Sequence, residues 1–114
     1  KTTRLVKEKM RLNDDQVITT FQSRFGREEW LKPYTSEILK ELPSKGIKDI
    51  HIISPGFSAD CLETLEELEE ENREYFIESG GKQYKYIPCL NDNNEHLDFI
   101  AHLIIKNTQG WNKE

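Results

Sequence analysis

The segment Ser54–Leu68 (SPGFSADCLETLEEL) decides the fold, because a Pro-Gly turn leaves an apolar run and leads straight into an acidic helix. The preceding run, Asp49–Ser54 (DIHIIS), predicts a strand that is buried on both faces. From Asp60 to Glu78 the chain has nine carboxylates and one base, Arg73. A strand, a tight turn and a helix in this order are typical of an α/β fold.

The acidic helix carries a row of carboxylates at the spacing i, i+4, i+7 and i+11, which places them along one helical face. The row consists of Glu63, Glu67, Glu70 and Glu74. Such a row can pass on a divalent cation or a proton, and it repels phosphate. A solvated helical face is the alternative. Asp60 and Glu63 have a further alternative, because an N-cap Asp followed three residues later by Glu can form a capping box.

Strands and helices alternate over the rest of the chain. We expect strands at about 16–22, 49–54 and 83–88, and helices at about 1–12, 35–42, 60–78 and 95–107. This order predicts an α/β fold with a parallel three-stranded sheet and helices on both faces. Ligands of such sheets bind beyond the carboxyl ends of the strands. Three strands are few for a sheet that is covered on both faces, so we expect part of the protein that packs against this chain to be missing. Apolar side chains of the first and last helices should then be exposed, among them Leu5, Val6, Met10, Leu97 and Ile104.

Composition and charge argue against several classes of function. The 114 residues have the size of one domain, with a net charge of −5 and a mean hydropathy of −0.77. Nucleic-acid binding needs a basic stripe, and the basic cluster at 1–11 is short and interrupted by Glu8. No run approaches the ~18 apolar residues of a membrane span, so we expect no span, and we expect no signal peptide. Because an initiator Met is lacking, we expect the chain to begin inside a longer product or after processing.

Other motifs are absent or have ordinary explanations. Without a G-x-G-x-x-G or P-loop motif, a nucleotide site lacks its phosphate cradle. Cys61 and Cys89 are expected to be reduced thiols of a cytosolic protein, with a disulfide or a two-thiol metal site as the alternative. His96 and His102 lie six residues apart, so they point about 240° apart on a helix and cannot chelate one ion together.

Three residues close to predicted strand ends are candidates for holding a ligand. Arg24 follows the first predicted strand, where it can bind a carboxylate substituent of a ligand or form a surface ion pair. Trp30 and Phe57, together with Phe25, can form an apolar platform at the same edge. Core or loop packing is the more common role of isolated aromatic residues.

Several short segments occur in the order and spacing of one known family. They are Phe21–Gly26 (FQSRFG), Glu29–Leu31 (EWL), Pro33–Thr35 (PYT), Ser54–Glu67, Gly80–Gly81, Tyr86–Pro88 (YIP) and Leu90–Asn91. Together they resemble the C-terminal half of ferrochelatase, most of all its bacterial branch. The resemblance extends from about Thr2 to Trp111.

The resemblance implies a fold of two Rossmann-like lobes with a porphyrin held in the cleft between them. Residues 1–114 would form the C-terminal lobe, a three-layer chelatase-like unit that begins in mid-helix. Ferrochelatase is a lyase of haem biosynthesis that inserts ferrous iron into protoporphyrin IX to form protohaem. Iron is therefore a substrate, no prosthetic group is implied, and the expected location is the cytoplasm.

The resemblance also assigns roles to the acidic residues. Glu63 matches the family's active-site glutamate, an iron ligand or proton acceptor. Asp60 matches an acidic residue beside it. Glu67 matches the next carboxylate of a row that leads metal or protons along a partly π-type helix, a relay to which Asp60, Glu70 and Glu74 would also belong. A carboxylate can ligate Fe²⁺ and can accept protons when its pKa is suitably tuned. Arg24, Trp30 and Phe57 are the candidates for the porphyrin cleft.

The chain departs from the pattern of the family, or of some of its members, in three respects. The family's active-site histidine belongs to the first lobe, and nothing here matches it. Cys61 stands where some members carry a second histidine, so we assign it no ligand role. The cluster-binding cysteines found at the C-terminus of some members are absent, so no iron–sulfur cluster is implied. Half of a cleft cannot bend the macrocycle, and we therefore expect this chain alone to be inactive.

Two alternatives from other classes remain open. One is a non-catalytic, flavodoxin-like interaction domain whose acidic helix recruits a basic partner. The other is a related chelatase that acts on another tetrapyrrole or another metal.

Overall fold

The computed structural model of the chain describes residues 1–24 and 26–111. Its sheet consists of two short strands, β1 (Asp49–Ile52) and β2 (Gln83–Tyr86). The strands are parallel, with Asp49 opposite Gln83 and Ile52 opposite Tyr86. Parallel neighbours need a long crossover connection, which here contains the acidic helix. The parallel pairing predicted for these two segments is therefore confirmed.

The third strand, predicted at 16–22, is not formed. Asp14–Gln16 (η1) is one turn of 3-10 helix, and Phe21 makes an isolated parallel bridge with Tyr34. The Phe21 N–H donates to the Pro33 carbonyl at 2.9 Å, and the Thr35 N–H donates to the Phe21 carbonyl at 3.0 Å. Since no described strand lies beside this segment to continue the ladder, its high β-propensity is not sufficient to make a strand.

The helices lie close to their predicted positions. They are α1 (Thr2–Met10), α2 (Thr35–Glu41), α3 (Asn72–Glu78) and α4 (Asn94–Asn107), with a 3-10 turn, η2 (Leu42–Lys45), after α2. The helix predicted at about 60–78 is built in two parts. Its first part is a π-helix, η3 (Glu63–Glu71), which continues directly into α3.

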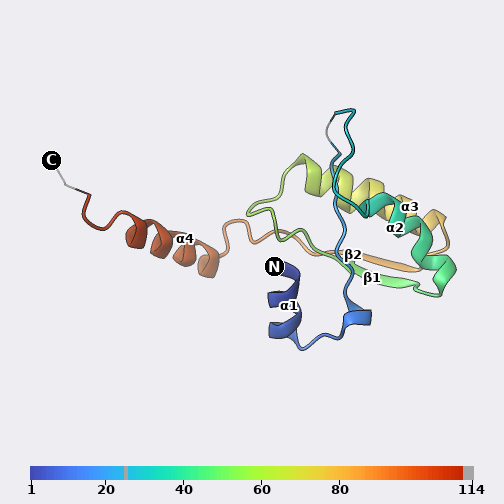
Figure 1. The fold of residues 1–114 in the computed structure, drawn as a ribbon, viewed down its shortest axis with the longest axis horizontal. Coiled ribbons are helices and arrows are strands. Elements are labelled where there is room, and N and C mark those ends of the chain that lie inside the picture. The colour runs from blue at the N-terminus through green and yellow to red at the C-terminus, as the bar shows by residue number, and fades with distance from the viewer. Residues whose placement is uncertain (25, 112–114) are drawn as a thin grey trace.

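The core lies between one face of the sheet and the helices α2 and α3, which run side by side (Figure 1). Leu39, Leu42 and Phe76 form its buried cluster, and Ile50 and Ile52 of β1 pack against it. Asp49 and His51, which alternate with these isoleucines, are exposed. The prediction that β1 is buried on both faces was therefore wrong, because among the described residues no helix covers its second face. A helix layer on that face stays a prediction.

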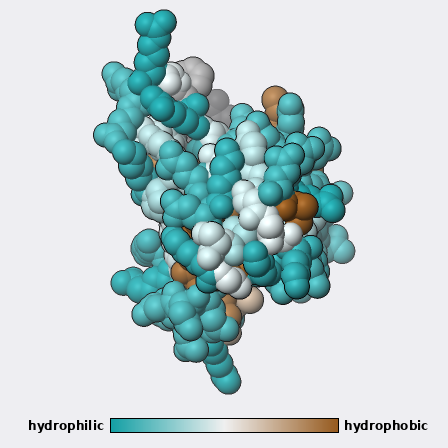
Figure 2. Space-filling view, turned by 90° about the vertical axis from the view of Figure 1, so that its right-hand side faces the viewer, coloured by the Kyte–Doolittle hydropathy of each residue, from teal (hydrophilic) through white to brown (hydrophobic). Residues whose placement is uncertain are grey.

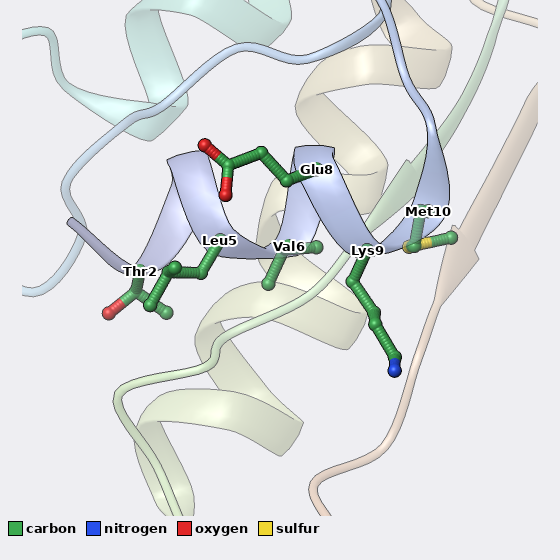
Figure 3. A pocket seen from close by; sticks show the side chains of 6 residues that line it. All are labelled: Thr2, Leu5, Val6, Glu8, Lys9 and Met10. Carbon is green, nitrogen blue, oxygen red and sulfur yellow. The ribbon is translucent and has the colours of Figure 1, made fainter.

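The first and last helices expose apolar side chains, as predicted. Helix α4 extends away from the sheet (Figure 1), and Leu97 and Ile104 are 48% and 57% exposed. On α1, Leu5 and Met10 are exposed and Val6 is half-buried. Figure 3 shows the side chains of α1 that line an open hollow along the helix, with Leu5 and Val6 pointing to the same side.

The rest of the surface is mainly hydrophilic. Figure 2 shows isolated apolar patches on an otherwise polar face. In the part of the chain that the structure describes, no helix has both the length and the apolar character needed to cross a membrane.

Gly81→Ala is expected to destabilise the fold. A Cβ at Gly81 would lie 2.3 Å from Cε1 of the Phe76 ring and 2.7 Å from the Phe76 carbonyl oxygen. Because Phe76 is fully buried, its ring cannot move aside. Overpacking of this kind costs ~1–3 kcal/mol, and chemical denaturation of the purified protein measures it. Gly56→Ala is the control, since nothing lies within 4 Å of its Cβ position. Equal losses in both variants would contradict the packing argument.

Candidate functional site

An open groove of about 530 Å³ runs along η3 and is lined mostly by carboxylates. The lining residues are Ser23, Arg24, Leu62, Glu63, Glu66, Glu67, Glu70, Glu71 and Glu74. The four carboxylates predicted to form a row thus share one groove. Sequence analysis missed Glu66 and Glu71, although each lies three or four residues after a member of the row. The groove is strongly anionic and suits a cation.

Side chains from two neighbouring elements satisfy the carbonyl groups of the π-helix. The Asn72 side-chain amide donates to the Glu67 carbonyl at 2.8 Å, and the Tyr84 hydroxyl donates to the Leu68 carbonyl at 2.5 Å. Burial, with a smaller effect of the Glu69 charge, raises the pKa of Tyr84 well above its ordinary value of 10. Tyr84 therefore stays a hydrogen-bond donor. The π-helix, whose i→i+5 bonds make a wider turn than an α-helix, is held from α3 and β2.

The Gln22–Ser23 segment is tied to η3 by three hydrogen bonds. Gln22 Nε2 donates to the Glu63 carbonyl at 3.0 Å, and the Ser23 N–H donates to Glu67 Oε1 at 2.7 Å. The Ser23 hydroxyl donates to Glu67 Oε2. Ser23 has a φ of 56°, a left-handed conformation that is uncommon for residues other than glycine. Both oxygens of Glu67 are thus engaged by one residue.

The Glu63 side chain is not used to cap the helix. The Asp60 N–H, which a capping box would direct to Glu63, donates instead to Asn91 Oδ1 at 2.8 Å. At the start of this helix the Thr64 hydroxyl, and not Glu63, accepts from a free N–H, that of Cys61, at 2.9 Å. The capping-box alternative was therefore wrong, because Asn91 takes the Asp60 N–H from a distant part of the chain.

Glu63 is exposed and ionised at neutral pH. The Cys61 thiol and the N–H of Glu63 itself hold the pKa of its carboxyl below the ordinary value of 4.5. An exposed, ionised carboxylate at the end of an anionic groove can bind a metal ion directly.

Asp60 differs from Glu63, because it does not line the groove. Its carboxylate accepts hydrogen bonds from Tyr86 and Cys89 at the carboxyl end of β2, and from Asn91 and Thr64. The Tyr86 hydroxyl, followed by the Asn91 amide, holds the pKa of Asp60 far below its ordinary value of 3.8.

The three residues predicted for a ligand cleft are not brought together at the groove. Arg24 lines it, but its guanidinium donates to the carbonyls of Arg27 and Glu28, at 2.9 and 3.2 Å. Trp30 is 40% exposed and Phe57 is half-buried, and neither lines the groove. Phe25 lies outside the described residues.

The groove is an open series of carboxylates and not a closed metal site. Within residues 1–24 and 26–111, no three His, Cys, Asp or Glu side chains come together to hold a metal ion. Cys61 and Cys89 are free thiols in the structure.

The fold and the site define a parallel α/β unit with an anionic groove along its acidic helix, and comparisons with known proteins specify the family. A family model described as ferrochelatase matches residues 1–108. The chain is 62% identical over 111 residues to a ferrochelatase of Marinobacter nauticus, and the aligned region is 97% of this chain and 30% of that relative. It is 57% identical over 114 residues to a ferrochelatase of Idiomarina loihiensis, and the aligned region is 100% of this chain and 31% of that relative.

The chain belongs to the ferrochelatase family. It spans about 30% of the length of the curated relatives that it matches. The resemblance noted from its sequence motifs is thereby confirmed.

Tyr84→Phe is expected to destabilise the π-helix by leaving the Leu68 carbonyl without its donor. Leu68 is almost fully buried, so losing the hydrogen bond should lower the free energy of unfolding by ~1–3 kcal/mol. Tyr75→Phe is the matched control, because the Tyr75 hydroxyl binds the exposed Glu71 carboxylate. Its effect should stay within about 0.5 kcal/mol. Denaturant titration measures both variants, and a Tyr84→Phe effect no larger than the control would contradict this account of the π-helix.

Proposed function

We propose that this chain is part of a ferrochelatase, a lyase that inserts ferrous iron into protoporphyrin IX to form protohaem in haem biosynthesis. The match of residues 1–108 to that family carries the proposal, and the anionic groove on η3 supports it. Because the relatives are about three times as long, the whole reaction is assigned to a complete protein of which residues 1–114 form the C-terminal, Rossmann-like lobe. The proposed location of that protein is the cytoplasm.

Glu63 is proposed as the residue that acts directly on the reactants, as an iron ligand or as a base. Insertion requires that ferrous iron lose part of its water shell and that two pyrrole protons be removed. A carboxylate can supply an oxygen ligand for the first step and a base for the second. The lowered pKa of Glu63 favours the ligand role, since a base works best with a pKa near the working pH and a ligand must be deprotonated.

The remaining carboxylates of the groove are proposed to lead cations to Glu63. Glu67, Glu70 and Glu74 lie along the same groove, so an ion can move between them without leaving the anionic surface. Each oxygen of Glu67 accepts one bond from Ser23 and keeps an acceptor site for an ion. The described residues offer no three converging ligands, which favours brief, successive binding over a resident ion. Asp60 was predicted to belong to this relay, but its four hydrogen bonds favour a different role, argued below.

The porphyrin is proposed to bind beside this groove, with the first lobe as the opposite wall. Arg24 would have to release the carbonyls of Arg27 and Glu28 to reach a porphyrin carboxylate, and Trp30 and Phe57 would supply apolar contact. The partner lobe also has to supply the family's active-site histidine. For this reason the chain alone is expected to be inactive, and metalloporphyrin formation above the enzyme-free rate would contradict that expectation.

Glu63→Gln tests the proposal in the full-length protein. The amide keeps the shape of the side chain but loses the charge and the basic oxygen. Changes next to metal ligands already cost ~10–100-fold in affinity or activity, so losing a ligand should cost more than ~100-fold in kcat/KM. That factor corresponds to about 2.7 kcal/mol of transition-state stabilisation. Steady-state iron insertion, with the melting temperature measured in parallel, gives the answer.

Glu69→Gln is the matched control for this experiment. Glu69 belongs to the same π-helix and is exposed, but it does not line the groove. Its neutralisation should leave kcat/KM within ~2-fold, as expected of a surface substitution away from the site. Near-normal turnover of a folded Glu63→Gln protein, or an equal loss in Glu69→Gln, would remove Glu63 from the proposed chemistry.

A further inference from the structure

We propose that Asp60 is a positioning residue for this reaction: its carboxylate ties the start of the π-helix to the end of β2 and to the loop before α4, so that Glu63 faces the groove. In this role it is neither an iron ligand nor a proton relay. The inference rests on the function proposed for Glu63. The hydrogen-bonded group that carries it, the Asp60 hub, consists of Asp60, Thr64, Tyr86, Cys89 and Asn91.

Both oxygens of Asp60 are occupied. Oδ1 accepts from the Tyr86 hydroxyl at 2.5 Å, the Thr64 hydroxyl at 3.0 Å and the Cys89 N–H at 3.2 Å. Oδ2 accepts from the Asn91 amide at 2.8 Å. Each carboxylate oxygen offers about two acceptor sites, so the donors saturate Oδ1 and use half of Oδ2. Asp60 also does not line the groove from which an ion would arrive.

Asn91 is bound to Asp60 in both directions. Its amide nitrogen donates to Asp60 Oδ2, and its amide oxygen accepts from the Asp60 N–H at 2.8 Å. Its own N–H donates to the Ser58 carbonyl at 3.0 Å. Asn91 has a φ of 49°, in the left-handed region that asparagine tolerates better than most residues. Asn91 therefore joins the loop after β1 to the loop after β2 by three hydrogen bonds, in addition to the bond from the Cys89 N–H.

His96 extends this connection into α4. Its Nδ1 lies 2.8 Å from the Asn91 carbonyl oxygen, which can only accept, so Nδ1 carries the proton. Its Nε2 lies 3.1 Å from the Ser58 hydroxyl. His96 is buried, so these contacts are shielded from water. The first turn of α4 is thereby attached to the same pair of loops.

Thr64 connects the Asp60 hub to the neighbouring residue Glu63. Its side chain is fully buried, and its hydroxyl donates to Asp60 Oδ1 and accepts from the Cys61 N–H at 2.9 Å. Consecutive residues of a helix point in different directions, so holding Thr64 inside directs its neighbour Glu63 outward. Glu63 is exposed at the groove, in agreement with this arrangement.

The ionisation states of Asp60 and Tyr86 fit a carboxylate that stays charged and in place. The Tyr86 hydroxyl lowers the pKa of Asp60 most, so Asp60 stays ionised throughout the neutral range and is a poor proton acceptor there. Burial, reinforced by Asp60, raises the pKa of Tyr86 well above 10, so Tyr86 remains a donor. A carboxylate that stays charged and accepts hydrogen bonds from several elements is suited to holding structure.

Asn91→Gly in the full-length protein tests the positioning role without changing any carboxylate. Glycine keeps the left-handed backbone but removes both side-chain bonds to Asp60. We expect kcat to fall ~10–100-fold, the range for residues that orient a ligand, with KM for ferrous iron and for porphyrin within ~2-fold. The control is Asn93→Gly in the same loop, which removes the cap on the Glu95 N–H but no hub contact. It should keep kcat within ~2-fold.

A double-mutant cycle with Glu63→Gln separates positioning from general stability. If Asn91 acts through Glu63, Asn91→Gly should have little further effect on kcat in the Glu63→Gln background. Losses that multiply, or a normal kcat in Asn91→Gly alone, would overturn the positioning role while leaving Glu63 in place. Near-normal turnover in Glu63→Gln alone would instead overturn the proposed function.

Should Asn91→Gly fail to fold, Tyr86→Phe repeats the test from the other side of the hub. It keeps the buried ring and removes the hydroxyl that donates to Asp60 Oδ1. The same fall in kcat with unchanged KM, absent in the Glu63→Gln background, is expected, and a kcat within ~2-fold of the parent would overturn the proposal.

Discussion

The parallel pairing of β1 and β2 is the constraint on which the rest of the structure depends. It brings the carboxyl ends of both strands to one edge, and the Ile87 N–H extends the pairing by donating to the Ile52 carbonyl at 2.9 Å. The loops that leave this edge lead into η3 and α4. Asp60 joins these segments through side-chain and backbone donors from both loops. The direction of the acidic helix therefore follows from the direction of the strands.

The π-helix η3, which lines the groove, is held in place by the elements around it. Hydrogen bonds from Tyr84 on β2 and Asn72 on α3 hold its carbonyls, and Gln22 and Ser23 hold its outer side. Carboxylates that share one groove repel each other, and a bound cation relieves this repulsion. The hydrogen bonds from these neighbours hold the π-helix in place despite that repulsion.

Much of the fold and part of the site could be predicted from sequence, because they depend on local patterns. The two strands, the four helices and the carboxylate row follow from periodicity, caps and turns. The segment 16–22 could not be predicted correctly, since a strand requires a neighbouring strand and Phe21 forms only an isolated bridge with Tyr34. The capping box failed for a similar reason. Asp60 binds Asn91, 31 residues away, and no local pattern encodes that bond or the one between His96 and Ser58.

The central claim is that Glu63 binds the cation while Asp60 holds the helix. Crystals of the full-length protein soaked in a divalent metal with a strong anomalous signal test both halves at once. The account predicts an anomalous peak at ligand distance from the Glu63 carboxylate, with further peaks along Glu67, Glu70 and Glu74 at higher metal concentration, and with the hydrogen bonds of Asp60 intact. A peak on Asp60 with Tyr86 and Asn91 displaced, or a saturated groove with no metal at Glu63, would contradict it.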